Sequence, residues 1–166
     1  MKKIYLTFVV FFLSIVVWSQ NHTVTIGTGT STQVYPLGNY YGYERSASLY
    51  TSTEIGYSGN VLQLIWDANT GNLGSRPIKI YLKETALNTL TSEAWSTTIS
   101  GAVLVYDNSV DPVSGLNTFV TTSTFNYSGT QNLLVLVEAN YGGWGVTGIS
   151  GNSVKYSNAT GKHMYV

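Results

Sequence analysis

Aromatic side chains beside glycines are the residues of this sequence best suited to binding chemistry. Trp144 lies in the run YGGWG, where the flanking glycines have no side chain to cover its ring, and Tyr141 precedes it by three residues. Tyrosine and tryptophan offer a flat apolar face with a polar tip, which suits stacking on sugars or filling a protein interface. We predict that Trp144 and Tyr141 bind a ligand; the alternative is that both rings close the end of a β-sheet core.

A second aromatic group occupies the tract YPLGNYYGYE, which begins at Tyr35. Proline and glycine in this tract indicate a turn that leads into a strand. Its rings Tyr40, Tyr41 and Tyr43 are interpreted mainly as packing residues of the fold. Tyr40 and Tyr41 are also candidate ligand-binding residues beside Trp144 and Tyr141.

The run DNSVDP holds the candidate metal ligands Asp107, Asn108 and Asp111. Their hard oxygen atoms are of the kind that calcium prefers, although the spacing is not that of an EF-hand loop. Aspartate and asparagine also favour turns without any metal, because their side chains hydrogen-bond the nearby backbone. A turn is the favoured interpretation and a structural calcium ion the alternative; no other cofactor is expected.

Catalytic patterns are missing from the sequence. A Ser-His-Asp site needs an imidazole base held by an orienting group, and the two histidines, His22 and His163, stand near opposite ends of the chain. The absence of cysteine excludes thiolate catalysis and cysteine-ligated zinc. Glycoside hydrolysis needs two carboxylates across a cleft, and the spacing of the acidic residues does not indicate such a pair. We expect no enzymatic activity.

Short alternating or apolar segments between turn formers predict about nine strands and no convincing helix. The expected strands cover residues 22–26, 48–54, 61–66, 78–83, 102–106, 117–122, 133–138, 153–157 and 162–166. Residues 85–95 are expected to form a loop with one helical turn at most, and residues 107–115 a long turn. The segment from Leu133 to Glu138 is the most apolar and is expected to be a central strand. These features predict an all-β fold of two stacked antiparallel sheets, a β-sandwich.

The N-terminal segment has the form of a secretory signal peptide. Lys2 and Lys3 precede an apolar run from Ile4 to Trp18, which is shorter than the roughly 20 residues that span a bilayer. We therefore expect residues 1–20 to be a signal peptide and residues 21–166 to be a β-sandwich module, secreted or at the cell surface. The alternative is a membrane anchor, but we expect no membrane insertion once the signal peptide is removed.

Charge and composition exclude one class of partner. The whole chain has 8 Lys and Arg against 8 Asp and Glu. Without Lys2 and Lys3 the balance is 6 against 8, a net charge of −2. A chain of this charge with no local basic patch is not a nucleic-acid binder. Its 13% aromatic and 10% charged residues are typical of an extracellular all-β module.

Three segments together resemble a known family. They are YYGYERSASLYTSTEIG (40–56), IKIYLKET (78–85) with Trp95 following it, and FNYSGTQNLLVLVEAN (125–140). The chain resembles, over roughly residues 23–155, the jelly-roll β-sandwich of secreted, type IX secretion-associated proteins of the Bacteroidota, and is similar to the cleaved adhesin domains of gingipain-like proteins. The resemblance implies a jelly-roll-like fold and a role in surface adhesion.

The sequence as a whole predicts a secreted, non-catalytic module that binds an extracellular glycan or a host or surface protein. Loops at one end of the sandwich would carry the recognition. The alternative is a structural spacer within a larger secreted or cell-surface protein, which predicts that the reading frame continues past Val166.

Overall fold

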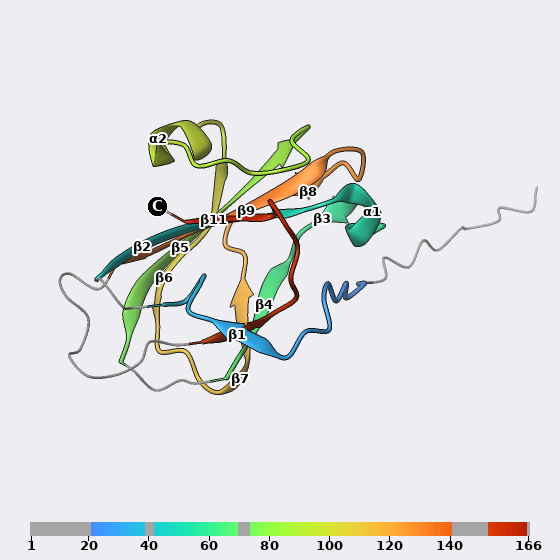
Figure 1. Ribbon diagram of the computed structural model, residues 1–166. Helices are drawn as coiled ribbons and strands as arrows, with labels where there is room; N and C mark the ends of the chain where they lie inside the picture. The colour runs from blue at the N-terminus through green and yellow to red at the C-terminus, as the bar shows by residue number, and fades with distance from the viewer. Residues whose placement is uncertain (1–20, 39–41, 70–73, 141–152, 166) are drawn as a thin grey trace, which may run out of the picture.

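A computed structural model describes residues 21–38, 42–69, 74–140 and 153–165 of the chain. Within these residues the fold is an antiparallel β-sandwich with two single-turn helices (Figure 1), so the predicted all-β class is confirmed. The elements in chain order are β1 (Ser31–Gln33), β2 (Tyr43–Tyr50), α1 (Ser52–Ile55), β3 (Gly59–Asn60), β4 (Gln63–Ala68), β5 (Arg76–Thr85), α2 (Trp95–Thr98), β6 (Val103–Val110), β7 (Gly115–Val120), β8 (Asn126–Tyr127), β9 (Asn132–Asn140), β10 (Val154–Tyr156) and β11 (His163–Tyr165).

The strand order is that of a jelly roll. One sheet has the order β1-β10-β4-β7 and the other β11-β2-β9-β5-β6, while β3 and β8 form a separate two-stranded ribbon. Four antiparallel pairs are nested in sequence order, so that each pair is enclosed along the chain by the one before it: β1/β10, β2/β9, β4/β7 and β5/β6. Successive nested pairs fall in alternate sheets, which is the jelly-roll pattern. β11 extends the second sheet by pairing with β2.

The core lies between the two sheets. Because side chains alternate across a strand, Ile78, Ile80 and Leu82 of β5 face inward and are fully buried. Phe119 of the opposite sheet packs among them, and Trp66 meets its ring edge-on at 5.2 Å between centroids. β9 lies in the middle of the five-stranded sheet, as predicted for the most apolar segment.

A second apolar cluster lies on the outer face of the five-stranded sheet. The segment after β5 folds back over that face and brings α2 against it (Figure 1). Trp95, the first residue of α2, is buried there with Leu136 of β9 and Met164 of β11. The loop expected over residues 85–95 is confirmed for residues 86–94, whereas the helical turn begins only at Trp95 and continues to Thr98. The loop and α2 cover only part of the outer face among the described residues.

The strand expected over residues 48–54 is wrong in its second half, where α1 begins after Tyr50. Thr51 Oγ1 accepts a hydrogen bond from the Glu54 amide (3.2 Å), and the Glu54 carboxylate accepts one from the Thr51 amide (2.7 Å). This reciprocal capping box satisfies two amides at the helix start. Gly56 then ends the turn in a left-handed conformation with φ 68°. The local capping signal prevails over the alternating pattern.

Two further boundaries differ from the prediction. Residues 22–26 have no strand partner among the described residues, since the edge of β10 is taken instead by β1. The expected turn over residues 107–115 begins later, because β6 continues to Val110 and pairs with the start of β5. Among the described residues no helix has the length and apolar composition needed to cross a bilayer.

Candidate functional site

The aromatic residues predicted to bind a ligand, Trp144, Tyr141, Tyr40 and Tyr41, lie outside the described residues. The segments that contain them join the described fold at one place. Residues 39–41 lead through Gly42 into Tyr43, residues 141–152 follow Asn140, and Tyr43 and Asn140 are cross-strand partners. Both segments therefore start at the same corner of the five-stranded sheet.

Tyr43 itself is described and contradicts its predicted packing role. Its side chain is 62% exposed at the start of β2. Alternation along β2 places it on the outer face with Arg45, since the residues between and beyond them face the core.

The predicted calcium ligands are divided between a strand and a turn. Asp107 and Asn108 lie within β6, so the turn prediction is wrong for them, and only Asp111 follows the strand. The reason is that this half of β6 finds a complete ladder partner in residues 76–79 of β5. In the ladder their side chains take the alternating directions of a strand, which separates them.

Each of the two carboxylates has a protein partner. Asp107 Oδ2 lies 3.6 Å from Lys79 Nζ, and Asp111 Oδ1 accepts a hydrogen bond from the Gly74 amide at 3.1 Å. In the part of the chain that the structure describes, no three Asp, Glu, His or Cys side chains come together as a metal site. Structural calcium stays an untested prediction.

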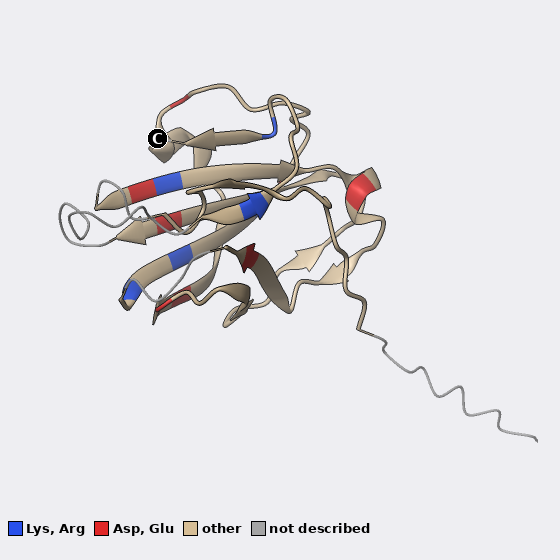
Figure 2. Cartoon of the chain, turned by 60° about the horizontal axis from the view of Figure 1, so that its bottom comes forward, with Lys and Arg blue, Asp and Glu red and all other residues tan. Residues whose placement is uncertain are grey.

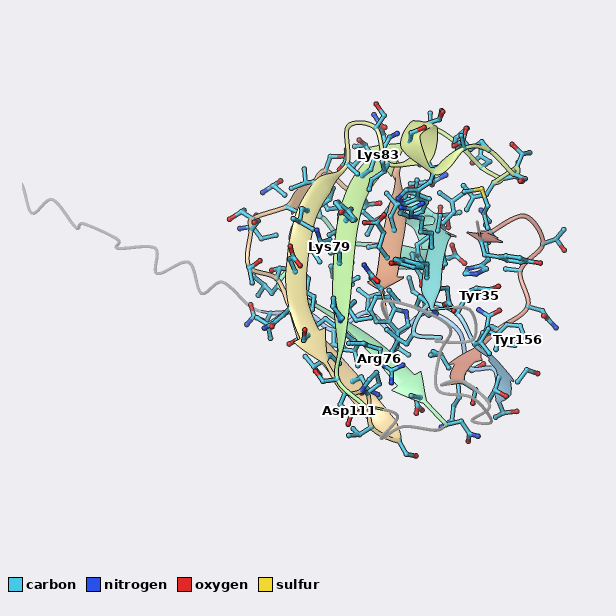
Figure 3. All side chains as sticks on the ribbon, turned by 90° about the vertical axis from the view of Figure 1, so that its left-hand side faces the viewer. Tyr35, Arg76, Lys79, Lys83, Asp111 and Tyr156 are labelled. Carbon is cyan, nitrogen blue, oxygen red and sulfur yellow. The ribbon has the colours of Figure 1, made fainter. Side chains whose placement is uncertain are left out.

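Among the described residues, the part of the outer face of the five-stranded sheet that α2 leaves open carries a row of charges that crosses four strands. The cross-strand register places Arg45 opposite Glu138, Glu138 opposite Lys79, and Lys79 opposite Asp107. The row thus runs across β2, β9, β5 and β6 with alternating sign, as the neighbouring basic and acidic positions in Figure 2 show. Figure 3 shows Lys79 and Lys83 along β5, with Arg76 at its start. We call this row, together with Tyr43, Tyr81 and Asn140, the polar platform.

Glu138 is the centre of the polar platform. Its Oε1 accepts hydrogen bonds from Arg45 Nε (2.9 Å) and from the Trp95 indole N–H (2.7 Å). Its Oε2 accepts one from the Tyr81 hydroxyl at 3.0 Å. The Arg45 guanidinium also lies 5.8 Å from the centre of the Trp95 ring, a cation–π contact. These contacts hold one carboxylate and one guanidinium in fixed directions, at the border of the second apolar cluster.

The Tyr81 hydroxyl is a permanent donor in this arrangement. Burial, followed by its hydrogen bond to the Glu138 carboxylate and that negative charge, raises the pKa of Tyr81 to about 12. Loss of its proton would leave two negative oxygens in contact, so the neutral form is favoured. The Tyr81 hydroxyl therefore keeps its proton, and with it the ability to donate to Glu138, over the whole neutral pH range.

A buried carboxyl group, that of Glu44, and a buried guanidinium group, that of Arg76, lie behind the platform, between the sheets. Glu44 follows Tyr43 in β2 but faces inward, where its Oε1 accepts a hydrogen bond from the Gly38 amide at 3.1 Å. Burial raises the pKa of Glu44 to about 7, although that hydrogen bond and the positive charge of Arg76 both act to lower it. Arg76, fully buried at the start of β5, lies on the same inner face (Figure 3). Gly38 is needed because a Cβ there would collide with the Glu44 carboxylate and with the Val34 carbonyl.

The fold brings a serine and a histidine together, which sequence reasoning missed. Ser48 and His163 are cross-strand partners in β2 and β11, and Ser48 Oγ lies 3.0 Å from His163 Nδ1. The ring of Tyr35 packs 5.5 Å from the imidazole, whose Nε2 is buried without a partner among the described residues. Burial lowers the pKa of His163. The pair is a contact between neighbouring strands, which links β11 to β2 at the edge of the five-stranded sheet.

Comparison with known proteins does not assign the chain to a family. Its sequence matches no protein-family model, and neither curated proteins nor solved structures gave a significant match.

Proposed function

We propose that residues 21–166 form a secreted or cell-surface, non-catalytic module that binds an extracellular glycan on the polar platform. The observation that carries the proposal is the row Arg45–Glu138–Lys79–Asp107 on a sheet face that no other described element covers, with the exposed ring of Tyr43 beside it. The resemblance to adhesin modules of the Bacteroidota supports the same class of function.

The chemistry of the platform suits a neutral, hydroxyl-rich ligand. The row contains two cations and two anions, so its charges balance and it offers donors and acceptors at regular intervals. Neighbouring strands are about 4.8 Å apart, a spacing that an extended chain of sugar rings can follow with one hydroxyl contact per strand. Tyr43 adds an aromatic face on which a sugar ring can stack. A strongly charged ligand would instead meet one unfavourable charge for each favourable one.

The placement of the carboxylates supports recognition over hydrolysis. Glu138 and Asp107 stand on the same flat sheet face with Lys79 between them. Glycosidases need their two carboxyl groups to face each other across the scissile bond. A shallow hollow of about 200 Å³ lies elsewhere, between residues 60–62 and 121–124, and is lined by none of the charged residues.

Binding of residues 21–166 to a panel of neutral and acidic polysaccharides, measured by calorimetry, tests the proposal. Tyr43→Ala and the double variant Lys79→Gln/Asp107→Asn should each weaken binding of the best neutral ligand about tenfold, which corresponds to about 1.4 kcal/mol. Trp144→Ala tests the sequence-based prediction for the adjoining segment separately.

The chain offers a matched control for the charged pair. Lys155 and Asp67 form a comparable exposed pair (2.7 Å) on the outer face of the other sheet, and the four side chains of the two pairs are all 37–49% exposed. Lys155→Gln/Asp67→Asn should leave binding unchanged. Equal effects of the two double variants, or no effect of Tyr43→Ala, would contradict the platform as the site. Absence of binding across the panel would favour the structural spacer.

A further inference from the structure

The two sheets end in four outer strands, and three of them are protected against pairing with another strand. β1 and β11 are only three residues long. β6 carries Asp107, and its register with β5 shifts between Ile80 and Tyr81. Short length, irregularity and charge are the usual protections of an edge strand. β7 has none of them, since its sequence GLNTFV is uncharged and its six pairs with β4 follow one unbroken register.

The unused backbone groups of β7 can be identified from the register. The Thr121 amide, just beyond β7, donates to the Leu62 carbonyl at 3.0 Å. Since hydrogen-bonded pairs alternate along an antiparallel ladder, Asn117 and Phe119 exchange bonds with β4. The N–H and C=O groups of Leu116, Thr118 and Val120 therefore point away from β4, toward the outer side of the edge.

The side chains of these same residues are exposed and largely apolar. Leu116 is 69% exposed and Val120 60% exposed, and both lie on the outer face of the sheet with Thr118 between them. Asp67, the cross-strand neighbour of Leu116, directs its carboxylate to Lys155 on β10, on the side away from the edge. The edge thus presents an uncharged, largely apolar strip whose outward hydrogen-bonding groups pair with no other described strand.

We propose that β7 pairs antiparallel with β7 of a second copy of this chain, around a twofold axis at Thr118. In this register Thr118 stands opposite its own copy, and Leu116 of each chain stands opposite Val120 of the other. All three pairs are then of the hydrogen-bonded type and exchange two bonds each. A twofold axis at Leu116 or at Val120 would leave part of this strip unpaired.

Pairing in this way joins the two four-stranded sheets into one continuous sheet and covers the Leu116 and Val120 side chains with each other. Such an interface is isologous and closed, so it yields a dimer and no fibre. Six residues of strand give a small interface compared with the roughly 1,600 Å² of a standard stable complex, so the dimer is concentration-dependent. The polar platform lies on the other sheet and stays open in both copies, which makes the dimer bivalent for a repeating glycan.

Sedimentation of residues 21–166 from micromolar to millimolar concentration tests the proposal, with a dimer expected at the upper end. Thr118→Pro should abolish dimerisation without unfolding the chain, because proline is tolerated where an edge amide points outward. Val120→Lys, which places a charge opposite Leu116 of the other copy, should weaken dimerisation at least tenfold. Thr32→Lys, on β1 at the opposite edge of the same sheet, is the matched control and should have no effect.

The register is tested by cross-linking, because the chain has no cysteine of its own. Thr118→Cys should form a covalent dimer under mild oxidation, since a hydrogen-bonded antiparallel pair has Cα atoms about 5.5 Å apart, within disulfide range. Thr32→Cys should not. Any one of three results would overturn the proposal. The chain could stay monomeric at all concentrations, Val120→Lys could leave the dimer dissociation constant unchanged, or the two cysteine variants could cross-link equally.

Discussion

Replacing Glu44 by glutamine should remove a large pH-dependent contribution to the stability of this protein. In the folded chain burial raises the pKa of Glu44 from its ordinary 4.5 to about 7. The folded state therefore holds a proton on Glu44 between these two pH values, whereas the unfolded state has lost it. Stability from this group is fully present below about pH 4.5 and is lost as the pH rises to about 7.

The magnitude follows from the two pKa values. Each pH unit between them changes the free energy of unfolding by about 1.4 kcal/mol. The interval from 4.5 to about 7 thus corresponds to about 3.5 kcal/mol. Glu44 is 8% exposed, so solvent does little to screen the unfavourable charge. The glutamine variant keeps an oxygen that can accept the Gly38 amide but has no proton to lose.

Urea unfolding of the wild type and of Glu44→Gln, at about pH 5 and about pH 8, measures this contribution. The difference in unfolding free energy between the two chains should shift by about 3 kcal/mol in favour of the variant at the higher pH. The two chains must be compared with each other because burial lowers the pKa of His163. Its titration therefore makes stability rise with pH, whereas the titration of Glu44 makes stability fall.

Glu54→Gln is the control for this experiment. Hydrogen bonds from Thr51 lower the pKa of the exposed Glu54, so that residue stays ionised at both pH values and its replacement should leave the wild-type pH profile intact. If the pH profile of Glu44→Gln matched that of the wild type, the inference that burial raises the pKa of the Glu44 carboxyl to about 7 would be refuted.

Three further predictions concern local contacts. Trp95→Ala should destabilise the fold by about 3–5 kcal/mol, since it removes the largest side chain of the second apolar cluster. Trp95→Phe keeps a ring in that cluster but loses the N–H donor to Glu138 and part of the buried indole, so it should cost less, about 1–3 kcal/mol; urea midpoints separate the two. Thr51→Ala should cost about 1 kcal/mol by removing the cap of α1, seen as a lower Tm. Burial lowers the pKa of His163, so stability should fall as the pH drops below about 6.5, and His163→Phe should abolish that loss in the same urea experiment.

The class of the fold was predictable from local patterns in the sequence. Alternating and apolar segments separated by turn formers indicated antiparallel strands, because each strand buries one or both faces whatever its partner is. The segment from Leu133 to Glu138 was identified as a central strand for the same reason, since only a strand covered on both faces can be apolar throughout. Thr51 and Glu54 show the limit of this reasoning, because a capping box changed a strand pattern into a helical turn.

The site could not be predicted in the same way, because it depends on which strands become neighbours and in what register. Arg45, Lys79 and Glu138 come from three strands far apart in the sequence, and a shift of one residue in any of them would turn its charge to the other face. The segment around Trp95 then decides which part of that face stays open. The sequence itself therefore determined the residues available and their alternation along each strand, while the tertiary structure alone determined the row of charges, the burial of Glu44 and the open edge of β7.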